Sequence, residues 1–278
     1  MKTLVLGAEG MLGRQVVKEF GSGNHSVVAA DRAEADIGNL SEVRNLFSSI
    51  TPEVVIHCAA YTDVDGAERD PERAYRVNAM GTRNVAQCCE EMRARLVHIS
   101  SDYVFDGTAC IPYREFDTPN PLSVYGHSKY QAEWYASRLC RRFVIVRTSW
   151  LYGPGGRNFV SAILEKARRG EELKVVDDQL GAPTFTGHLA QALKNIVEAD
   201  ALGIFHVTGQ GRCTWFEFAK YILEKRNMDV PVTPVLTPEL GQLAPRPSFS
   251  LLDNFNMRLE GIPLLPHWRD GLAAHFGE

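Results

Sequence analysis

The chain begins with an apolar segment that runs straight into a glycine-rich turn, and this junction restricts the fold more than any other feature. Residues 2–6 have the length of a buried strand, and residues 11–20 have the apolar spacing of a helix. Between them, Gly7, Gly10 and Gly13 form a Gly-x-x-Gly-x-x-Gly pattern. Glycines at such a junction allow a tight turn and let backbone N–H groups approach a pyrophosphate. The junction predicts a dinucleotide-binding unit, and a purely structural turn is the alternative.

Strand and helix patterns continue to alternate through the first half of the chain. Strands are predicted at residues 27–30, 53–59, 95–99 and 143–147, and helices at 43–50, 72–92 and 123–140. Residues 53–59 are almost wholly apolar, as in a strand that is buried on both faces. This order predicts an α/β fold, namely a Rossmann-like, doubly wound parallel sheet with helices on both faces.

The pattern changes after Ser149, where residues 153–156 (Gly-Pro-Gly-Gly) interrupt the alternation. Helices are predicted beyond this point at 159–169, 187–198 and 216–225, and short strands at 173–176 and 204–208. Residues 229–247 hold five of the fourteen prolines, so we expect an extended, irregular chain there. We predict a dinucleotide-binding domain over residues 1–150, with contributions from about 185–210, and a smaller lobe, mainly substrate-binding, over 151–278.

Composition excludes several classes of protein. The net charge of −4 gives no support for a nucleic-acid partner, which usually requires a basic face. No apolar run approaches the ~18 residues that cross a bilayer, and the apolar start is too short for a signal peptide. The six cysteines have neither the density of a disulfide scaffold nor a zinc-site spacing. We therefore expect a cytoplasmic protein without a membrane or nucleic-acid partner.

Charged residues after the second strand bear on which dinucleotide is bound. Asp31 ends that strand, where a carboxylate can accept a hydrogen bond from a ribose 2′-hydroxyl and favour NADH. Arg32 follows it and can instead hold the 2′-phosphate of NADPH, while a turn cap is the alternative role of Asp31. Asp36 and Ile37 can meet the amino group and ring face of adenine. These residues leave NADH and NADPH as alternatives.

A second group of residues points to proton transfer. Tyr125 and Lys129 are spaced i and i+4 on a predicted helix, so they share one face. An ammonium beside a phenol favours the phenolate, and we expect Lys129 to lower the pKa of Tyr125. Ser101 ends a predicted strand at the edge of the sheet where ligands bind, and its hydroxyl can hold a substrate carbonyl. Since a Tyr-x-x-x-Lys pair is common by chance, the prediction of a catalytic set depends on all three residues.

The glycine turn, the hydroxyl at the strand end and the Tyr-x-x-x-Lys pair together resemble the extended short-chain dehydrogenase/reductase superfamily. In this resemblance Asn78 matches a helix asparagine that supports a proton relay, and His57 stands where an asparagine is usual. The resemblance and the junction together imply these cofactor-binding residues: Gly7, Gly10, Met11, Leu12, Gly13, Asp31, Arg32, Asp36, Ile37, Ala59, Ala60, Tyr61, Asn78, Tyr125 and Lys129.

Five further segments narrow the resemblance to the dTDP-4-dehydrorhamnose reductase family. They are residues 60–68, 100–107, 147–153, 176–184 and 245–253, and the likeness extends over about residues 2–276. It implies that the substrate-binding residues are Ser101, Asp102, Tyr103, Trp150, Gln179 and Arg246. Arg246 would reach the diphosphate. For Trp150 a core position is the alternative, and for Asp102 a strand cap.

The resemblance implies NAD(P)H-dependent reduction of the 4-keto group of dTDP-4-dehydro-L-rhamnose, a step toward cell-surface polysaccharide. Another nucleotide-sugar epimerase or dehydratase of the same fold is one alternative. A non-catalytic regulatory subunit, like that of methionine adenosyltransferase, is another, although the intact Ser-Tyr-Lys set favours a catalyst. Some family members use acidic residues at a magnesium-assisted dimer contact. Because Gln15 occupies the expected acidic position, no metal is predicted, and a homodimer remains one candidate state.

Overall fold

Six parallel strands form the central sheet of the computed structural model, which describes residues 1–22 and 26–278. Their order across the sheet is β10-β5-β4-β3-β1-β2. The strands are β1 (Lys2–Leu6), β2 (Ser26–Ala30), β3 (Val54–His57), β4 (Arg95–Ser101), β5 (Phe143–Thr148) and β10 (Gly203–His206). The predicted α/β fold with a Rossmann-like, doubly wound parallel sheet is confirmed.

The winding of the sheet reverses beside β1, because β2 lies on one side of β1 and β3 on the other. Ligands of open α/β sheets bind at such a reversal, at the carboxyl ends of the strands. The glycine turn lies there, with Gly7 at a φ of +74°. A Cβ on Gly7 would stand only 2.6 Å from the backbone nitrogen of Ala59, so the turn after β1 touches the segment after β3.

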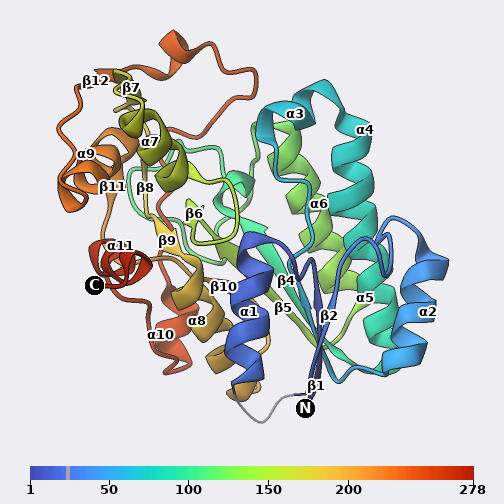
Figure 1. Ribbon diagram of the computed structural model, residues 1–278. Helices are drawn as coiled ribbons and strands as arrows, with labels where there is room; N and C mark the ends of the chain where they lie inside the picture. Colours follow the sequence, from blue (N-terminus) through green and yellow to red (C-terminus); the bar gives the residue numbers. More distant parts are fainter. Residues whose placement is uncertain (23–25) are drawn as a thin grey trace.

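Helices cover both faces of the sheet. On one face α1 (Met11–Gly21) packs against α8 (Thr186–Glu198), and on the other lie α2 (Leu40–Ile50), α5 (Gly81–Met92) and α6 (Val124–Leu139) (Figure 1). Successive side chains of β1 point to opposite faces of the sheet, since Val5 packs in one apolar core while Leu4 and Leu6 pack in the other. Burial on both faces explains why these strands read as nearly continuous apolar runs.

The predicted helix at residues 72–92 is present as one continuous helical segment over residues 71–92, but part of it is π-helical. It consists of α4 (Pro71–Ala74), a π-helical turn, η1 (Tyr75–Met80), and α5. Single π turns inside helices are often found at functional sites. This one contains Asn78, whose side chain bonds the backbone of Tyr61. A short helix that the sequence patterns did not predict, α3 (Val64–Arg69), precedes it and is capped by Asp63.

The C-terminal lobe is assembled from small pieces. Its strands are β6 (Leu151–Tyr152), β7 (Leu173–Val176), β8 (Leu180–Gly181), β9 (Thr184–Phe185), β11 (Cys213–Thr214) and β12 (Val232–Val235). Its helices are α7 (Phe159–Arg168), α9 (Trp215–Lys225), α10 (Phe255–Leu259) and α11 (Trp268–Phe276). The expectation that the whole of residues 229–247 is irregular was wrong, because β12 pairs with β7 and Thr237–Leu240 form a 3-10 turn, η3. The domain division at residue 150 stays a prediction.

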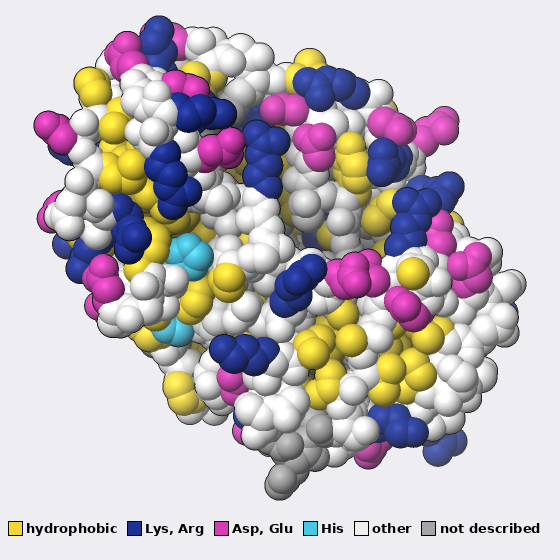
Figure 2. All heavy atoms as spheres, viewed as in Figure 1, with side chains coloured by type: hydrophobic (Ala, Val, Ile, Leu, Met, Phe, Trp, Pro, Cys, Tyr) yellow, Lys and Arg dark blue, Asp and Glu magenta, His cyan; other side chains and the backbone are white. Residues whose placement is uncertain are grey.

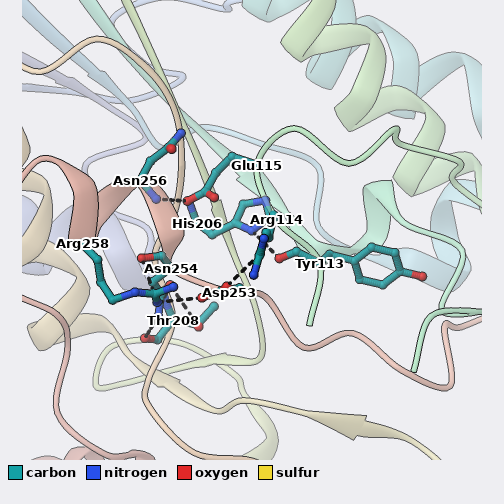
Figure 3. A network of polar contacts seen from close by, with 9 residues as sticks. All are labelled: Tyr113, Arg114, Glu115, His206, Thr208, Asp253, Asn254, Asn256 and Arg258. Carbon is teal, nitrogen blue, oxygen red and sulfur yellow. Dashed lines mark hydrogen bonds and ion pairs between the residues drawn. The ribbon is translucent and has the colours of Figure 1, made fainter. Parts of the chain in front are cut away.

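A network of polar contacts, drawn in Figure 3, fixes the C-terminal segment against the central sheet. The buried carboxylate of Glu115 accepts hydrogen bonds from the backbone nitrogens of His206 (3.1 Å) and Asn256 (3.0 Å). His206 belongs to β10, and Asn256 belongs to α10. Glu115 therefore links the loop between β4 and α6 to the edge strand β10 and to helix α10.

Three findings complete the description of the chain. All six cysteines carry free thiols. Of the helices in residues 1–22 and 26–278, none is both long and apolar enough to cross a membrane. Within the same residues, no three or more His, Cys, Asp or Glu side chains converge as metal ligands would, and the metal-free expectation stays a prediction.

Candidate active site

A cavity of about 620 Å³ lies beside the glycine turn, and we call it the cofactor cavity. It brings together nine of the predicted cofactor-binding residues: Gly7, Gly10, Asp31, Arg32, Asp36, Ile37, Ala59, Ala60 and Tyr61. These residues come from the loops after β1, β2 and β3, so the parallel arrangement of the strands gathers them at one edge. Met11, Leu12, Gly13, Asn78, Tyr125 and Lys129 do not line it.

The glycine turn has the shape that a pyrophosphate requires. A Cβ on Gly13 would overlap the carbonyl oxygen of Gly7, so α1 begins in close contact with the turn. Gly10 is the N-cap of α1 and has no side chain to occupy the first free N–H groups of the helix. Met11 and Leu12 supply two of those groups, and the side chain of Leu12 is buried. The cavity and its glycine cradle therefore fit a dinucleotide.

Asp31 is already bonded to the backbone of its own surroundings. One carboxylate oxygen accepts a hydrogen bond from Glu9 N (2.8 Å), and the other accepts one from Arg32 N (3.0 Å). Each oxygen retains capacity for a further bond, because a carboxylate has about four acceptor positions. The structure thus agrees with the turn-cap role and leaves room for the ribose role.

The sequence reasoning missed two arginines that line the cofactor cavity, Arg73 and Arg76. Arg76 pairs with Asp36 at 2.9 Å, and the guanidinium of Arg73 lies 5.0 Å from the ring centre of Tyr61. A backbone hydrogen bond from Gly38 is the main reason why the pKa of Asp36 is lowered, and Arg76 contributes to the same effect. No local motif marks these arginines, because α4 and η1 reach the cavity only through tertiary packing.

Tyr125 lies on α6, half-buried, and interacts with Ser101 at the end of β4. Burial raises the pKa of Tyr125 to about 12, Asp102 raises it further, and the hydrogen bond with Ser101 opposes this. The expectation that Lys129 lowers this pKa was wrong. The Lys129 ammonium instead lies 2.6 Å from the carbonyl oxygen of Ile99, on the neighbouring strand, and donates to it. At neutral pH Tyr125 keeps its proton and can donate it.

Lys129 is itself a buried cation, with 2% of its surface exposed. Burial lowers its pKa to about 8, while the nearby Glu133 favours the charged form. The same burial raises the pKa of the Cys58 thiol to about 12, so Cys58 stays neutral. Cys58 also lines the cofactor cavity, which places the charge of Lys129 close to that cavity.

Asn78 is fully engaged with its neighbours. Its amide nitrogen donates to the hydroxyl of Ser128 (2.9 Å) and to the carbonyl of Tyr61 (3.1 Å). Its oxygen accepts a hydrogen bond from Tyr61 N (2.8 Å). Asn78 therefore shapes the loop that lines the cofactor cavity, and a direct part in a proton relay stays a prediction.

A second cavity, of about 270 Å³, is lined by Tyr103, which follows β4, and by residues of the C-terminal lobe, and we call it the substrate cavity. Three predicted substrate-binding residues line it: Tyr103, Gln179 and Arg246. The ring of Tyr103 meets that of Tyr125 edge-on, with ring centres 5.5 Å apart. Tyr103 therefore lies between this cavity and Tyr125, the proposed proton donor. In Figure 2 the surface is hollowed between the two parts of the molecule, with charged side chains along the rim.

The lining of the substrate cavity is held in place by fixed contacts. Arg246 forms a two-point ion pair with Asp65 of α3, with a closest distance of 3.0 Å. Gln179 donates to Thr237 (2.9 Å) and accepts from Trp215 (3.2 Å), so its amide orients other residues.

The remaining predicted substrate residues, Ser101, Asp102 and Trp150, do not line this cavity. Trp150 stacks on Trp215 with ring centres 3.5 Å apart and has a φ of +49°, so it supports the cavity wall through its neighbour. Ser101 and Asp102 are buried at the end of β4. Burial raises the pKa of the Asp102 carboxyl to about 6. Whether these six residues contact substrate stays a prediction.

Comparison with known proteins places the chain in a family. It matches the family described as RmlD substrate binding domain over residues 1–278. It is 37% identical over 277 residues to the spore coat polysaccharide biosynthesis protein SpsK of Bacillus subtilis, spanning 100% of this chain and 97% of that protein. It is 38% identical over 265 residues to the dTDP-4-dehydrorhamnose reductase of Aggregatibacter actinomycetemcomitans, spanning 91% and 90% respectively.

A solved structure agrees with this assignment. The dTDP-4-dehydrorhamnose reductase of Bacillus anthracis, determined in complex with NADP, superposes with a TM-score of 0.97. The two chains are 41% identical, and the match spans 99% of this chain and 98% of that one. Both the sequence and the fold therefore show that this chain belongs to the dTDP-4-dehydrorhamnose reductase family.

Proposed function

We propose that the protein is an NAD(P)H-dependent reductase that converts dTDP-4-dehydro-L-rhamnose to dTDP-L-rhamnose, a precursor of cell-surface polysaccharide. The observation that carries this proposal is the position of Tyr125. It interacts with Ser101 at the carboxyl edge of the sheet and lies one helical turn from Lys129, and its ring meets that of Tyr103, a residue of the substrate cavity. Family membership and the fit of the cofactor cavity support the same activity.

Reduction of a ketone requires one hydride at carbon and one proton at oxygen. The nicotinamide, when bound, supplies the hydride for carbon 4 of the sugar. Tyr125 donates the proton to the carbonyl oxygen, since its raised pKa keeps the phenol protonated at neutral pH. Ser101 holds that oxygen by a hydrogen bond, and the remaining N–H of the Lys129 ammonium would hold the ribose of the nicotinamide cofactor.

Recognition of the nucleotide sugar belongs to the substrate cavity. Arg246 binds the diphosphate, because a guanidinium presents paired donors to phosphate oxygens and Asp65 holds it in orientation. Tyr103 supplies an aromatic wall on the side of Tyr125. Trp215, supported by Trp150 and Gln179, supplies another wall for the deoxysugar.

The test is an assay of the purified protein with dTDP-4-dehydro-L-rhamnose and either NADPH or NADH, followed by the loss of reduced-cofactor fluorescence. We expect one mole of cofactor to be oxidised for each mole of sugar reduced. We also expect the cofactor to dissociate from the protein after each turnover. Failure to turn over with either cofactor, in protein that melts cooperatively, would exclude the reductase. Tightly retained NAD with no net oxidation would indicate an epimerase or dehydratase instead.

A further inference from the structure

Two histidines face each other directly across the β3–β4 ladder, below the proposed catalytic lysine. His57 and His98 are register partners, each is 1% exposed, and their ring centres are 5.3 Å apart. Their side chains lie on the face of the sheet that α5 and α6 cover, since His57 contacts Thr82 of α5 and His98 contacts Lys129 of α6. We call these four residues the lysine cluster.

The contacts of Lys129 account for most of its donors. Its ammonium carries three N–H groups. One donates to the carbonyl of Ile99 at 2.6 Å, and a second lies 3.4 Å from Nε2 of His98. One N–H group therefore remains for the reaction, and the two bonds to β4 decide where the ammonium sits.

This arrangement requires a particular form of His98. An ammonium can only donate, so Nε2 of His98 must carry the lone pair and the ring proton must be on Nδ1. Burial and the charge of Lys129 both lower the pKa of His98 well below its usual value, which keeps the ring neutral. Nδ1 of His98 and Nδ1 of His57 have no hydrogen-bond partner among the described residues.

We propose that His98 is a positioning residue for catalysis, whose imidazole accepts a hydrogen bond from Lys129 and, with the Ile99 carbonyl, fixes the position of the ammonium. His57 packs on the His98 ring and is itself anchored by Thr82. Asn78, the residue expected to act in the proton relay, is committed to Tyr61 and Ser128. The proposal rests on the reductase function proposed above.

The proposal predicts how the charge of Lys129 responds when the acceptor is removed. The titratable groups that act on Lys129 are Glu133 on the same helix, Cys58 after β3, and the two histidines. Glu133 and Cys58 remain in a His98→Leu variant, but the ammonium loses an acceptor and gains an apolar neighbour. The charged form of Lys129 is then destabilised, so its proton leaves at lower pH.

The first test compares pH profiles of kcat/KM for His98→Leu, His98→Gln and the wild type. In His98→Leu we expect the alkaline fall of activity to move down by about one pH unit. His98→Gln, which keeps an acceptor, should retain the wild-type profile. His127→Gln is the matched control, because His127 is exposed on the same helix. Equal profiles for all variants would overturn the proposal, as would a Gln variant that behaves like Leu.

The second test needs neither a variant nor activity. Nitrogen NMR of the wild-type histidines reports which ring nitrogen carries the proton. We expect His98 to be neutral, with its proton on Nδ1, from about pH 6 to about pH 8. A proton on Nε2, or a ring that titrates in this range, would overturn the proposal. Because this readout is independent of turnover, an inactive protein with the expected tautomer would contradict only the proposed function.

Discussion

Helix α6 buries two charged side chains one turn apart, and their surroundings differ sharply. Glu133 accepts hydrogen bonds from Ser100 (2.5 Å) and from two nitrogens of Arg147 (2.7 and 2.9 Å), so both its oxygens are occupied. We call these three residues the arginine cluster. The lysine cluster on the preceding turn has one carbonyl and one imidazole for the ammonium, and two ring nitrogens without a partner.

This difference indicates that the arginine cluster stabilises the fold, whereas the lysine cluster takes part in the reaction. A buried charge with all its bonds made is rigid, and removing its partner is costly. A buried charge with an unused donor and a lowered pKa can change its partners during a reaction, as groups at active sites do. On this view, damage to the arginine cluster should lower stability first, while damage around Lys129 should lower activity first.

The largest effect is expected from Tyr125→Phe, which removes the proton donor beside the lysine cluster. We expect kcat to fall by about 10²–10⁴-fold, with the melting temperature and NADP binding close to wild type. Steady-state kinetics, thermal unfolding and fluorescence titration with NADP measure these three quantities. Tyr130→Phe is the matched control, since Tyr130 is exposed on the same helix. A Tyr125→Phe variant with full activity would point to the non-catalytic alternative.

The next effect is on stability, and it comes from the arginine cluster. Glu133→Leu leaves Arg147 buried without its carboxylate, and we expect a loss of about 3–5 kcal/mol in the free energy of unfolding. Urea unfolding measures it. The matched control is Glu91→Gln, which breaks the exposed pair with Arg44 and should leave the unfolding midpoint unchanged. Equal midpoints for both variants would contradict the contrast between the two clusters.

Much of the fold was predictable, because local patterns determine it. The run before Gly7, the alternation of strands and helices, and the i, i+4 spacing of Tyr125 and Lys129 are all visible along the chain. The C-terminal lobe was less predictable, since several of its strands contain only two residues and form through distant partners.

Several residues of the candidate site could be predicted from the sequence, but their hydrogen-bond partners and pKa values could not. The sequence places Lys129 beside Tyr125, yet it cannot show that the ammonium turns to Ile99 or that burial dominates the pKa of Tyr125. Arg76 and His98 were missed for a related reason. Each reaches its cavity or partner through packing between elements far apart in the sequence, and no short motif surrounds it.

A smaller effect concerns the pH dependence of stability. Burial, helped by Lys129, lowers the pKa of His57 to about 3. Below the ordinary histidine pKa of about 6.5 the unfolded chain binds a proton that the folded protein does not, so stability falls with decreasing pH. The stability of the wild type relative to His57→Asn should therefore decrease by about 1.4 kcal/mol per pH unit between about pH 6.5 and the folded-state pKa of about 3. Urea unfolding at several pH values measures this, and a constant difference would contradict it.

Hydride delivery to carbon 4 of the sugar is the central step of the proposed reaction. The measurement is the reaction of dTDP-4-dehydro-L-rhamnose with NADPH that carries deuterium at the transferable position, followed by NMR of the product. We expect dTDP-L-rhamnose with deuterium at carbon 4 and an equal amount of oxidised cofactor. A product that carries no deuterium at carbon 4, or one formed without net cofactor oxidation, would contradict the account.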